Sequence, residues 1–252
     1  MRILIAVPVF NEQQYVEDVL ARIRRLADDV LVVDDGSTDA TPDILTATPG
    51  ITVIRHAVNR GYGRSLIDAF EHAANRGYDW IITIDCDDQH EPARIPAFIE
   101  RAAQDDVDII SGSRYLVDLP GNTAPPGDRR RINRRVTDLL NQTLDLNLTD
   151  AFCGFKAYRV AAMRRLCLTI PGYAFPMQFW VQAARLGLRI CELPVRLIYN
   201  DPTRHFGGLL DDPHARMQHY LDVFHTELTE LAKTKSAISC AASCESATIT
   251  DA

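Results

Sequence analysis

The sequence has no long apolar run and no closely spaced pair of cysteines. No segment reaches the roughly 18 consecutive apolar residues that cross a bilayer, and the N-terminal run 3–10 is too short for a signal peptide. The six cysteines include no C-x-x-C pair, so we expect reduced thiols in a cytoplasmic protein. These absences exclude membrane-spanning and disulfide-stapled classes, whereas peripheral contact with the inner face of a membrane stays open.

Positive charge is in the minority. The formal net charge is −7, which disfavours a partner such as nucleic acid because proteins that bind it are usually basic. The exception is the segment 129–135, where five arginines crowd into seven residues. This cluster could hold a phosphorylated acceptor or rest on anionic lipid, or it could be the solvated face of a helix.

Short apolar runs alternate with helical patterns along the first half of the chain. Buried strands are expected at residues 2–7, 30–33, 51–54, 80–84 and 107–110, and helices at 12–26, 59–73 and 95–103. This order predicts an α/β fold with a mainly parallel sheet flanked by helices. The second half is expected to contain helices at 129–144, 161–166, 177–186 and 211–233, and an extended segment at 188–197. Small polar residues predict a disordered tail at 236–252.

The most informative motif follows the fourth expected strand. Asp85 and Asp87 stand two residues apart, and Gln89 follows two residues further on. An extended backbone points both carboxylates the same way, and α/β proteins bind ligands at the carboxyl ends of their strands. Such oxygen ligands suit Mg²⁺, which takes one or two carboxylates together with substrate phosphates. We therefore favour a metal–diphosphate site over the alternative, a solvated turn.

Polar residues also follow the neighbouring strands. Asp35 could accept hydrogen bonds from a nucleotide base, and Arg114 could bind a diphosphate. Phe10 could pack on a base and Glu12 could hold a ribose, although a helix N-terminus explains that segment equally well. The glycine loop 59–63 lacks a full nucleotide fingerprint, and we interpret it as a tight turn before a helix.

The motifs occur in one succession along the chain: Pro8-x-Phe10-Asn11-Glu12, Asp34-Asp35-Gly36-Ser37, Asn59-x-Gly61-x-Gly63, Asp85-x-Asp87-x-Gln89, Gly112-Ser113-Arg114-Tyr115 and Asp150-x-x-Cys153-Gly154-Phe155-Lys156. This ordered set resembles the family-2 inverting glycosyltransferases, and within them the dolichyl-phosphate mannosyltransferase-like group. The resemblance implies a GT-A type fold. It also implies a single catalytic domain at 1–235, with a donor-binding half at about 1–115 and an acceptor-side half at about 116–235.

By this resemblance, the enzyme would move a hexose, mannose or glucose, from a nucleotide-diphosphate sugar of the GDP-mannose or UDP-glucose class. The residues expected around the nucleotide and diphosphate are Pro8, Phe10, Glu12, Val33, Asp35, Asp85, Cys86 and Asp87. Asp87 and Gln89 would hold Mg²⁺ or Mn²⁺, and Arg114 would meet the diphosphate or the acceptor phosphate. The residues expected around the acceptor are Arg129, Arg130, Asn133 and Gln178.

The acceptor is inferred from the chemistry. Loss of the sugar leaves negative charge on the departing nucleotide, which a divalent ion and an arginine stabilise. An alcohol acceptor would need a general base, for which Asp150 is the candidate, whereas a phosphate monoester needs none. Many family members have a carboxylate where Gln178 stands here, and this difference favours a polyprenyl phosphate. The segment 204–210 departs from the Gly-x-Ser-Lys element of the group, which bears on the acceptor more than on the donor.

Two other classes stay open. A sugar-nucleotide pyrophosphorylase would share the α/β layout and the use of Mg²⁺, but its glycine-rich N-terminal loop is missing here. A non-catalytic nucleotide-sugar-binding module is disfavoured by the intact Asp85, Asp87, Gln89 and Arg114. The apolar helix face within 217–231 could pack in the core, form a homodimer or touch a membrane, and core packing is the preferred interpretation.

Overall fold

Strands and helices alternate through the first half of the chain, as the apolar pattern predicted. The computed structural model describes residues 1–200 and 205–245, with 231, 232 and 234–245 described by their backbone alone. The strands are β1 (Ile3–Val9), β2 (Val30–Asp34), β3 (Thr52–Arg55), β4 (Trp80–Thr83), β5 (Ile109–Ser113), β6 (Lys156–Arg159) and β7 (Ile190–Pro194). They form one sheet in the order β3-β2-β1-β4-β6-β5-β7, in which only the pairings of β6 are antiparallel.

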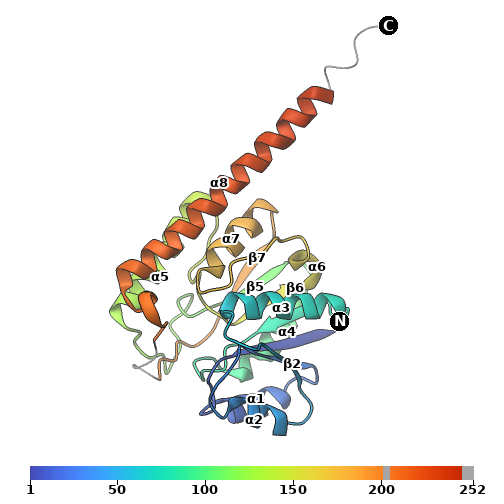
Figure 1. Cartoon of the computed structure of the whole chain (residues 1–252), viewed down its shortest axis with the longest axis vertical. Helices are drawn as coiled ribbons and strands as arrows, with labels where there is room; N and C mark the ends of the chain where they lie inside the picture. Colours follow the sequence, from blue (N-terminus) through green and yellow to red (C-terminus); the bar gives the residue numbers. More distant parts are fainter. Residues whose placement is uncertain (201–204, 246–252) are drawn as a thin grey trace.

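Helices cover both faces of the sheet because its strands are apolar at successive positions. In β1, Leu4 and Ala6 join one core cluster while Ile5 and Val7 join the other. The first cluster is covered by α3 (Tyr62–Asn75), α5 (Gly127–Leu144), α6 (Val160–Met163), α7 (Phe175–Arg185) and α8 (Pro213–Glu245). The second is covered by α1 (Val16–Arg24), α2 (Thr41–Ala47) and α4 (Ile95–Ala102) (Figure 1). Short 3₁₀ turns occur at η1 (Pro92–Arg94) and η2 (Gly208–Asp211).

Strand β6 is the strand that the apolar pattern did not predict, and helix α2 was not predicted either. Strand β6 has four residues, and two of them are Lys156 and Arg159, so no apolar run marks it. It lies between β4 and β5 and pairs antiparallel with both, which brings strands from the two halves of the chain into one sheet. As a result, the segment just before β6 lies beside the end of β4, where Asp85 follows.

Helix α8 is longer than the pattern predicted. Its apolar face packs in the core, where Tyr220 and Phe224 are buried and Met217 is partly buried, which confirms the preferred interpretation for the described side chains. The backbone of 236–245 continues this helix where a disordered tail was expected, and 246–252 lie outside the described residues. Figure 1 shows the last turns of α8 projecting away from the sheet. Among the described residues, no helix has the length and apolar character of a bilayer span.

The described cysteines are all free thiols, as expected from their spacing: Cys86, Cys153, Cys167 and Cys191. The side chains of Cys240 and Cys244 lie outside the described part of the chain.

Candidate active site

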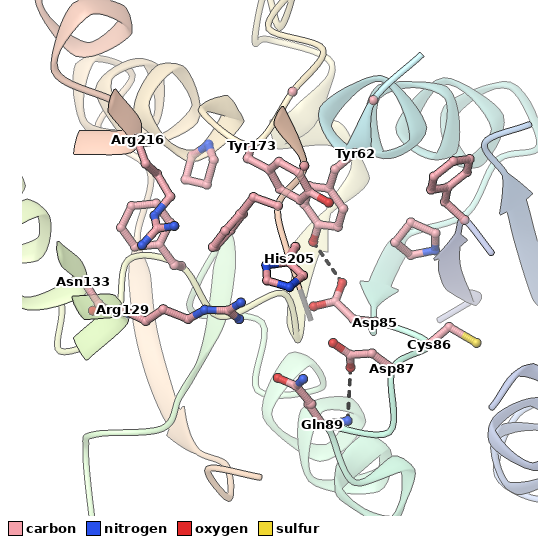
Figure 2. Close-up of a pocket in the computed structure, with 18 of the residues that line it drawn as sticks. Tyr62, Asp85, Cys86, Asp87, Gln89, Arg129, Asn133, Tyr173, His205 and Arg216 are labelled. Carbon is pink, nitrogen blue, oxygen red and sulfur yellow. Dashed lines mark hydrogen bonds between the residues drawn. The ribbon is translucent and has the colours of Figure 1, made fainter. Parts of the chain in front are cut away.

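A cleft of about 540 Å³ opens at the carboxyl ends of β1, β2, β4 and β5. Parallel strands bring their carboxyl ends to one edge of the sheet, so residues distant in sequence meet there. The predicted site residues that line the cleft are Pro8, Phe10, Glu12, Asp35, Asp85, Cys86, Asp87, Gln89, Arg114, Arg129 and Asn133. Figure 2 shows that the acidic group and Arg129 reach into the same space from opposite sides.

The acidic edge of the cleft is built after β4. Asp85 Oδ1 accepts a hydrogen bond from the Tyr62 hydroxyl at 3.1 Å, and Asp85 Oδ2 lies 3.4 Å from His90 Nε2. Asp87 Oδ1 accepts the backbone N–H of Gln89 at 3.1 Å (Figure 2). Burial and then the charge of Asp85 raise the pKa of Tyr62 well above its usual value, so the phenol keeps its proton and donates.

This edge fits a hard divalent cation. Within 1–200 and 205–245, no three His, Cys, Asp or Glu side chains gather into a metal site. Mg²⁺ nevertheless needs only one or two carboxylates when substrate phosphates complete its coordination. Gln89 Nε2 is buried and has no hydrogen-bond partner among the described residues. Because the two ends of a carboxamide exchange by rotation, Gln89 can present its oxygen in that place.

A buried ion pair supports the opposite side of the cleft. Arg114 binds Asp150 through two hydrogen bonds, Nε to Oδ2 at 2.7 Å and Nη2 to Oδ1 at 3.0 Å. Asn133 Nδ2 donates to Asp150 Oδ1 at 2.8 Å. Burial raises the pKa of Asp150, but the charge of Arg114 and these hydrogen bonds outweigh it and hold that pKa well below its usual range. Asp150 is therefore a fixed anion that orients Arg114.

Aromatic rings and arginines form the rest of this side. The Arg129 guanidinium lies 4.8 Å from the ring centre of Phe206 and 5.2 Å from that of Tyr199. The Arg216 guanidinium lies 4.4 Å from the same Phe206 ring and is bound by Asp128 at 2.6 Å. Cation–π contacts of this kind fix the position of a guanidinium and leave its positive charge available to an anionic ligand. The cleft thus places a positive, aromatic half against an acidic half.

Comparison with known proteins identifies the family. The model of Glycosyl transferase family 2 matches residues 4–167. The chain belongs to glycosyl transferase family 2. This glycosyltransferase is 32% identical to the undecaprenyl-phosphate mannosyltransferase of Micrococcus luteus, over 84% of this chain and 90% of that protein. It is 26% identical to the polyprenol monophosphomannose synthase of Mycolicibacterium smegmatis, over 77% of this chain and 76% of that protein.

The fold is shared with solved structures of this type. The glucosyl-3-phosphoglycerate synthase of Mycobacterium tuberculosis, in complex with UDP, superposes with a TM-score of 0.67 at 21% identity, over 90% of this chain and 79% of that one. Another structure of that synthase contains Mn²⁺, UDP and glucosyl-3-phosphoglycerate. The GT-A type fold expected from the motifs is confirmed.

Four residues that the sequence assigned to the site of this glycosyltransferase lie outside the cleft lining. Val33 is buried in the sheet core. Asp150 is fully buried behind Arg114, and Arg130 lies over the Tyr115 ring at 3.5 Å from its centre. The fourth, Gln178, is a buried residue of α7 whose side chain contacts α8.

The carboxamide of Gln178 is occupied within the protein. Its Oε1 accepts the backbone N–H groups of Thr169 at 2.7 Å and Ile170 at 3.1 Å. Its Nε2 donates to Thr169 Oγ1 at 3.1 Å and to Glu227 at 2.9 Å. These bonds join α7 to α8 and to the preceding loop, so the structure gives Gln178 a structural role, and an acceptor contact at this residue stays a prediction.

Aromatic residues are what sequence reasoning missed in this glycosyltransferase. The cleft is also lined by Tyr62, Tyr115, Phe152, Tyr173, Tyr199, Phe206 and Tyr220. They are spread along the chain from Tyr62 to Tyr220 and share no local spacing, so only the fold shows that they converge. Within the segment 204–210 that departs from the Gly-x-Ser-Lys element, His205, Phe206 and Gly207 line the cleft, whereas Arg204 lies outside the described residues.

A Gly154→Ala substitution is expected to reduce transfer by about 100-fold with little loss of stability. A Cβ at Gly154 would lie 2.0 Å from Asp85 Oδ2, so the carboxylate must leave its place. Displacement of a positioned group by about 1 Å costs a factor of this size. The matched control is Gly127→Ala, where the nearest atom to the added Cβ, the flexible Arg131 Nη1, lies 3.6 Å away. Steady-state kinetics and thermal melting of both variants test this, and normal activity of the Gly154 variant would contradict it.

Proposed function

We propose that the protein is a metal-dependent inverting transferase that moves a hexose from a nucleotide-diphosphate sugar to a polyprenyl phosphate. The observation that supports this most directly is the division of one cleft into an acidic edge and an arginine–aromatic half. Residues 1–235 would act as one catalytic domain, with the donor bound mainly by 1–115 and the acceptor by 116–235. Strands from both halves form the single sheet beneath the cleft.

The donor would lie along the ends of β1, β2 and β4. Phe10 is 43% exposed at this edge, which leaves its ring available to a base. Glu12 and Asp35 supply carboxylates for ribose and base, and Asp85 and Asp87 face the diphosphate. Asp87 and Gln89 would hold Mg²⁺ or Mn²⁺, which when bound neutralises the charge that develops on the departing nucleoside diphosphate.

The acceptor would enter from the arginine–aromatic half. Arg129 meets its phosphate and Asn133 lies one helical turn further along α5. Arg114, held in place by Asp150, supports the phosphates on either substrate. A phosphate monoester is already an anion and needs no general base. The one carboxylate that the sequence offered as a base is fully buried and paired, which favours a phosphate over an alcohol acceptor.

The relatives support this acceptor class and suggest mannose as the sugar. Two are named undecaprenyl-phosphate mannosyltransferase and polyprenol monophosphomannose synthase. An acceptor of that class has its phosphate at a membrane surface, so we propose peripheral contact with the inner face of the membrane during turnover. GDP-mannose and UDP-glucose are the two donor candidates.

The test is a transfer assay with GDP-mannose or UDP-glucose, undecaprenyl phosphate in detergent, and Mn²⁺ or Mg²⁺. We expect a glycosylated lipid, an inverted anomeric centre, and release of a nucleoside diphosphate. Formation of a nucleotide sugar and pyrophosphate from a sugar 1-phosphate and a nucleoside triphosphate, with no transfer to the lipid, would instead identify a sugar-nucleotide pyrophosphorylase. Donor binding that raises the melting temperature without turnover in the presence of any acceptor would identify a binding module.

An Arg129→Ala variant is expected to raise the KM for polyprenyl phosphate by about 10- to 100-fold, the range that loss of a charged hydrogen bond produces. The Kd of the nucleoside diphosphate should change less than threefold, because Arg129 lies on the far side of the cleft from the donor edge. Arg131→Ala is the control, since Arg131 is exposed on the same helix. A weaker donor affinity with an unchanged acceptor KM would refute the acceptor role of α5.

A further inference from the structure

His56 lies between two carboxylates, one of which borders the cleft. Its Nδ1 is 2.6 Å from Asp35 Oδ1, and its Nε2 is 2.7 Å from Asp68 Oδ2. The imidazole is almost completely buried, with a side-chain exposure of 5%. Each ring nitrogen lies within hydrogen-bond distance of a carboxylate oxygen, on opposite edges of the imidazole. The histidine therefore bridges Asp35 to α3.

The topology places this histidine beside Asp35. It is the first residue after β3, and its backbone N–H donates to the carbonyl of Asp34 at 2.9 Å. On its other side, Asp68 belongs to α3 and is also bound by Arg64. The imidazole is thus held by a helix that packs on β1 and β2. Its contact with Asp35 therefore restricts rotation of that carboxylate.

The remaining bonds to Asp35 limit its orientation further. Oδ1 accepts the backbone N–H of Arg60 at 2.8 Å, and Oδ2 accepts that of Gly61 at 2.8 Å. Gly61 has a φ of 101°, and a Cβ there would meet the carbonyl oxygen of Pro171 at 2.4 Å, so the loop that donates these bonds is itself closely packed. Oδ1 is therefore engaged by the imidazole and by the Arg60 N–H, whereas Oδ2 accepts one N–H and has a second lone pair for a ligand in the cleft.

We infer that His56 is a positioning residue that aims Asp35 Oδ2 at an N–H group of the donor's nucleobase. This inference rests on the proposed function, because it requires a nucleotide at the donor edge. A planar ring with nitrogens on opposite edges is needed to reach both carboxylates. Asparagine is shorter and reaches only one of them, so Asp35 loses its connection to Asp68 of α3. Base recognition should then weaken, while the sites of diphosphate and metal binding stay in place.

The test compares ligands with and without a base. Binding of GDP, UDP and inorganic diphosphate is measured by titration calorimetry with Mn²⁺ present, for the wild type, His56→Asn and Asp35→Asn. We expect His56→Asn to raise the Kd of the bound nucleoside diphosphate about tenfold, the effect of losing a charge-assisted hydrogen bond. The Kd of inorganic diphosphate should change less than twofold, an outcome that a general loss of structure would not produce.

A double-mutant cycle tests whether His56 acts through Asp35. The Asp35→Asn/His56→Asn variant should bind no more weakly than Asp35→Asn alone, because the effect of the histidine passes through that carboxylate. Asp68→Asn provides a second variant with a milder change, and about a threefold rise in Kd is expected. His72→Asn, on the half-buried side of the same helix α3, is the matched control and should match the wild type.

Three results would overturn the inference: unchanged nucleoside diphosphate binding by His56→Asn, an equal loss for inorganic diphosphate, or additive effects in the cycle. Failure of the proposed function is distinguishable from these. If the wild type binds neither GDP nor UDP, the donor site itself is refuted, and the inference about His56 with it. If the wild type binds one of them and the variants do not follow the pattern, only the role of His56 is wrong.

Discussion

An Asp87→Asn variant is expected to lose about 1,000-fold of its transfer rate while its free energy of unfolding changes by less than about 1 kcal/mol. The carboxylate lies at the cleft edge and accepts one backbone N–H, which an asparagine oxygen can also accept. The variant therefore keeps the hydrogen bond with the Gln89 backbone. What the variant lacks is the negative charge of the carboxylate that we expect to hold the divalent ion beside the diphosphate. Release of nucleoside diphosphate measures the rate, and denaturant unfolding measures stability.

The adjacent Asp88 provides the matched control. It has a φ of 55°, a conformation that asparagine tolerates, and its side chain is bound by Arg22 of α1. Asp88→Asn should thus keep its activity within about threefold, since a partly exposed ion pair contributes little. A second readout is the rise in melting temperature that Mn²⁺ and nucleoside diphosphate produce together, which Asp87→Asn should abolish. Full activity of Asp87→Asn would refute the metal assignment.

An Asp150→Asn variant is expected to lose about 3 kcal/mol of stability at pH 7, because it leaves the Arg114 guanidinium without its buried counter-ion. Asp150 is fully buried and receives hydrogen bonds from both Arg114 and Asn133. Transfer should fall as well, since Arg114 loses the bonds that orient it. Asp138→Asn is the control on α5, where the carboxylate is 58% exposed and its ion pair with Arg134 is solvated.

The stability difference between wild type and Asp150→Asn should depend on pH. The pKa of Asp150 in the folded protein lies well below its ordinary value of 3.8, against the opposing effect of burial, because of the charge and hydrogen bonds of Arg114. The unfolded chain then binds more protons, so this contribution is complete above pH 3.8 and decreases as the pH falls below it toward the folded pKa. Denaturant unfolding of both proteins from pH 7 to pH 3 measures the difference. A difference that stays constant or grows below pH 3.8 would contradict the assignment.

Much of the fold and of the acidic edge could be predicted from local sequence. The strands at the N-terminal half are apolar runs, and polar residues such as Asp35, Asp85 and Arg114 come directly after them. Because parallel strands end at one edge of a sheet, that order alone implies that these side chains meet. All three line the cleft. The glycine loop was also interpreted correctly, since Gly61 adopts a positive φ in tight contact with Pro171.

The acceptor half was less predictable. Gln178 matches a family position in sequence, yet its carboxamide is bound to Thr169 and Glu227 in the structure. Within the arginine cluster, Arg129 lines the cleft while Arg130 lies on Tyr115, although they are adjacent in the chain. Helical rotation and the position of neighbouring rings separate them, and neither can be deduced from spacing.

The order of apolar runs and of the polar residues behind them was enough to establish an α/β sheet, its parallel first half and the acidic edge of the site. Those features depend on contacts between strands and on the residues next to their ends, which local pattern encodes. The antiparallel β6, the pairing of Asp150 with Arg114, the bridge at His56 and the aromatic lining all depend on contacts between segments far apart in the chain. Contacts of this kind produce no periodic pattern in the sequence, so only the folded structure shows which residues meet.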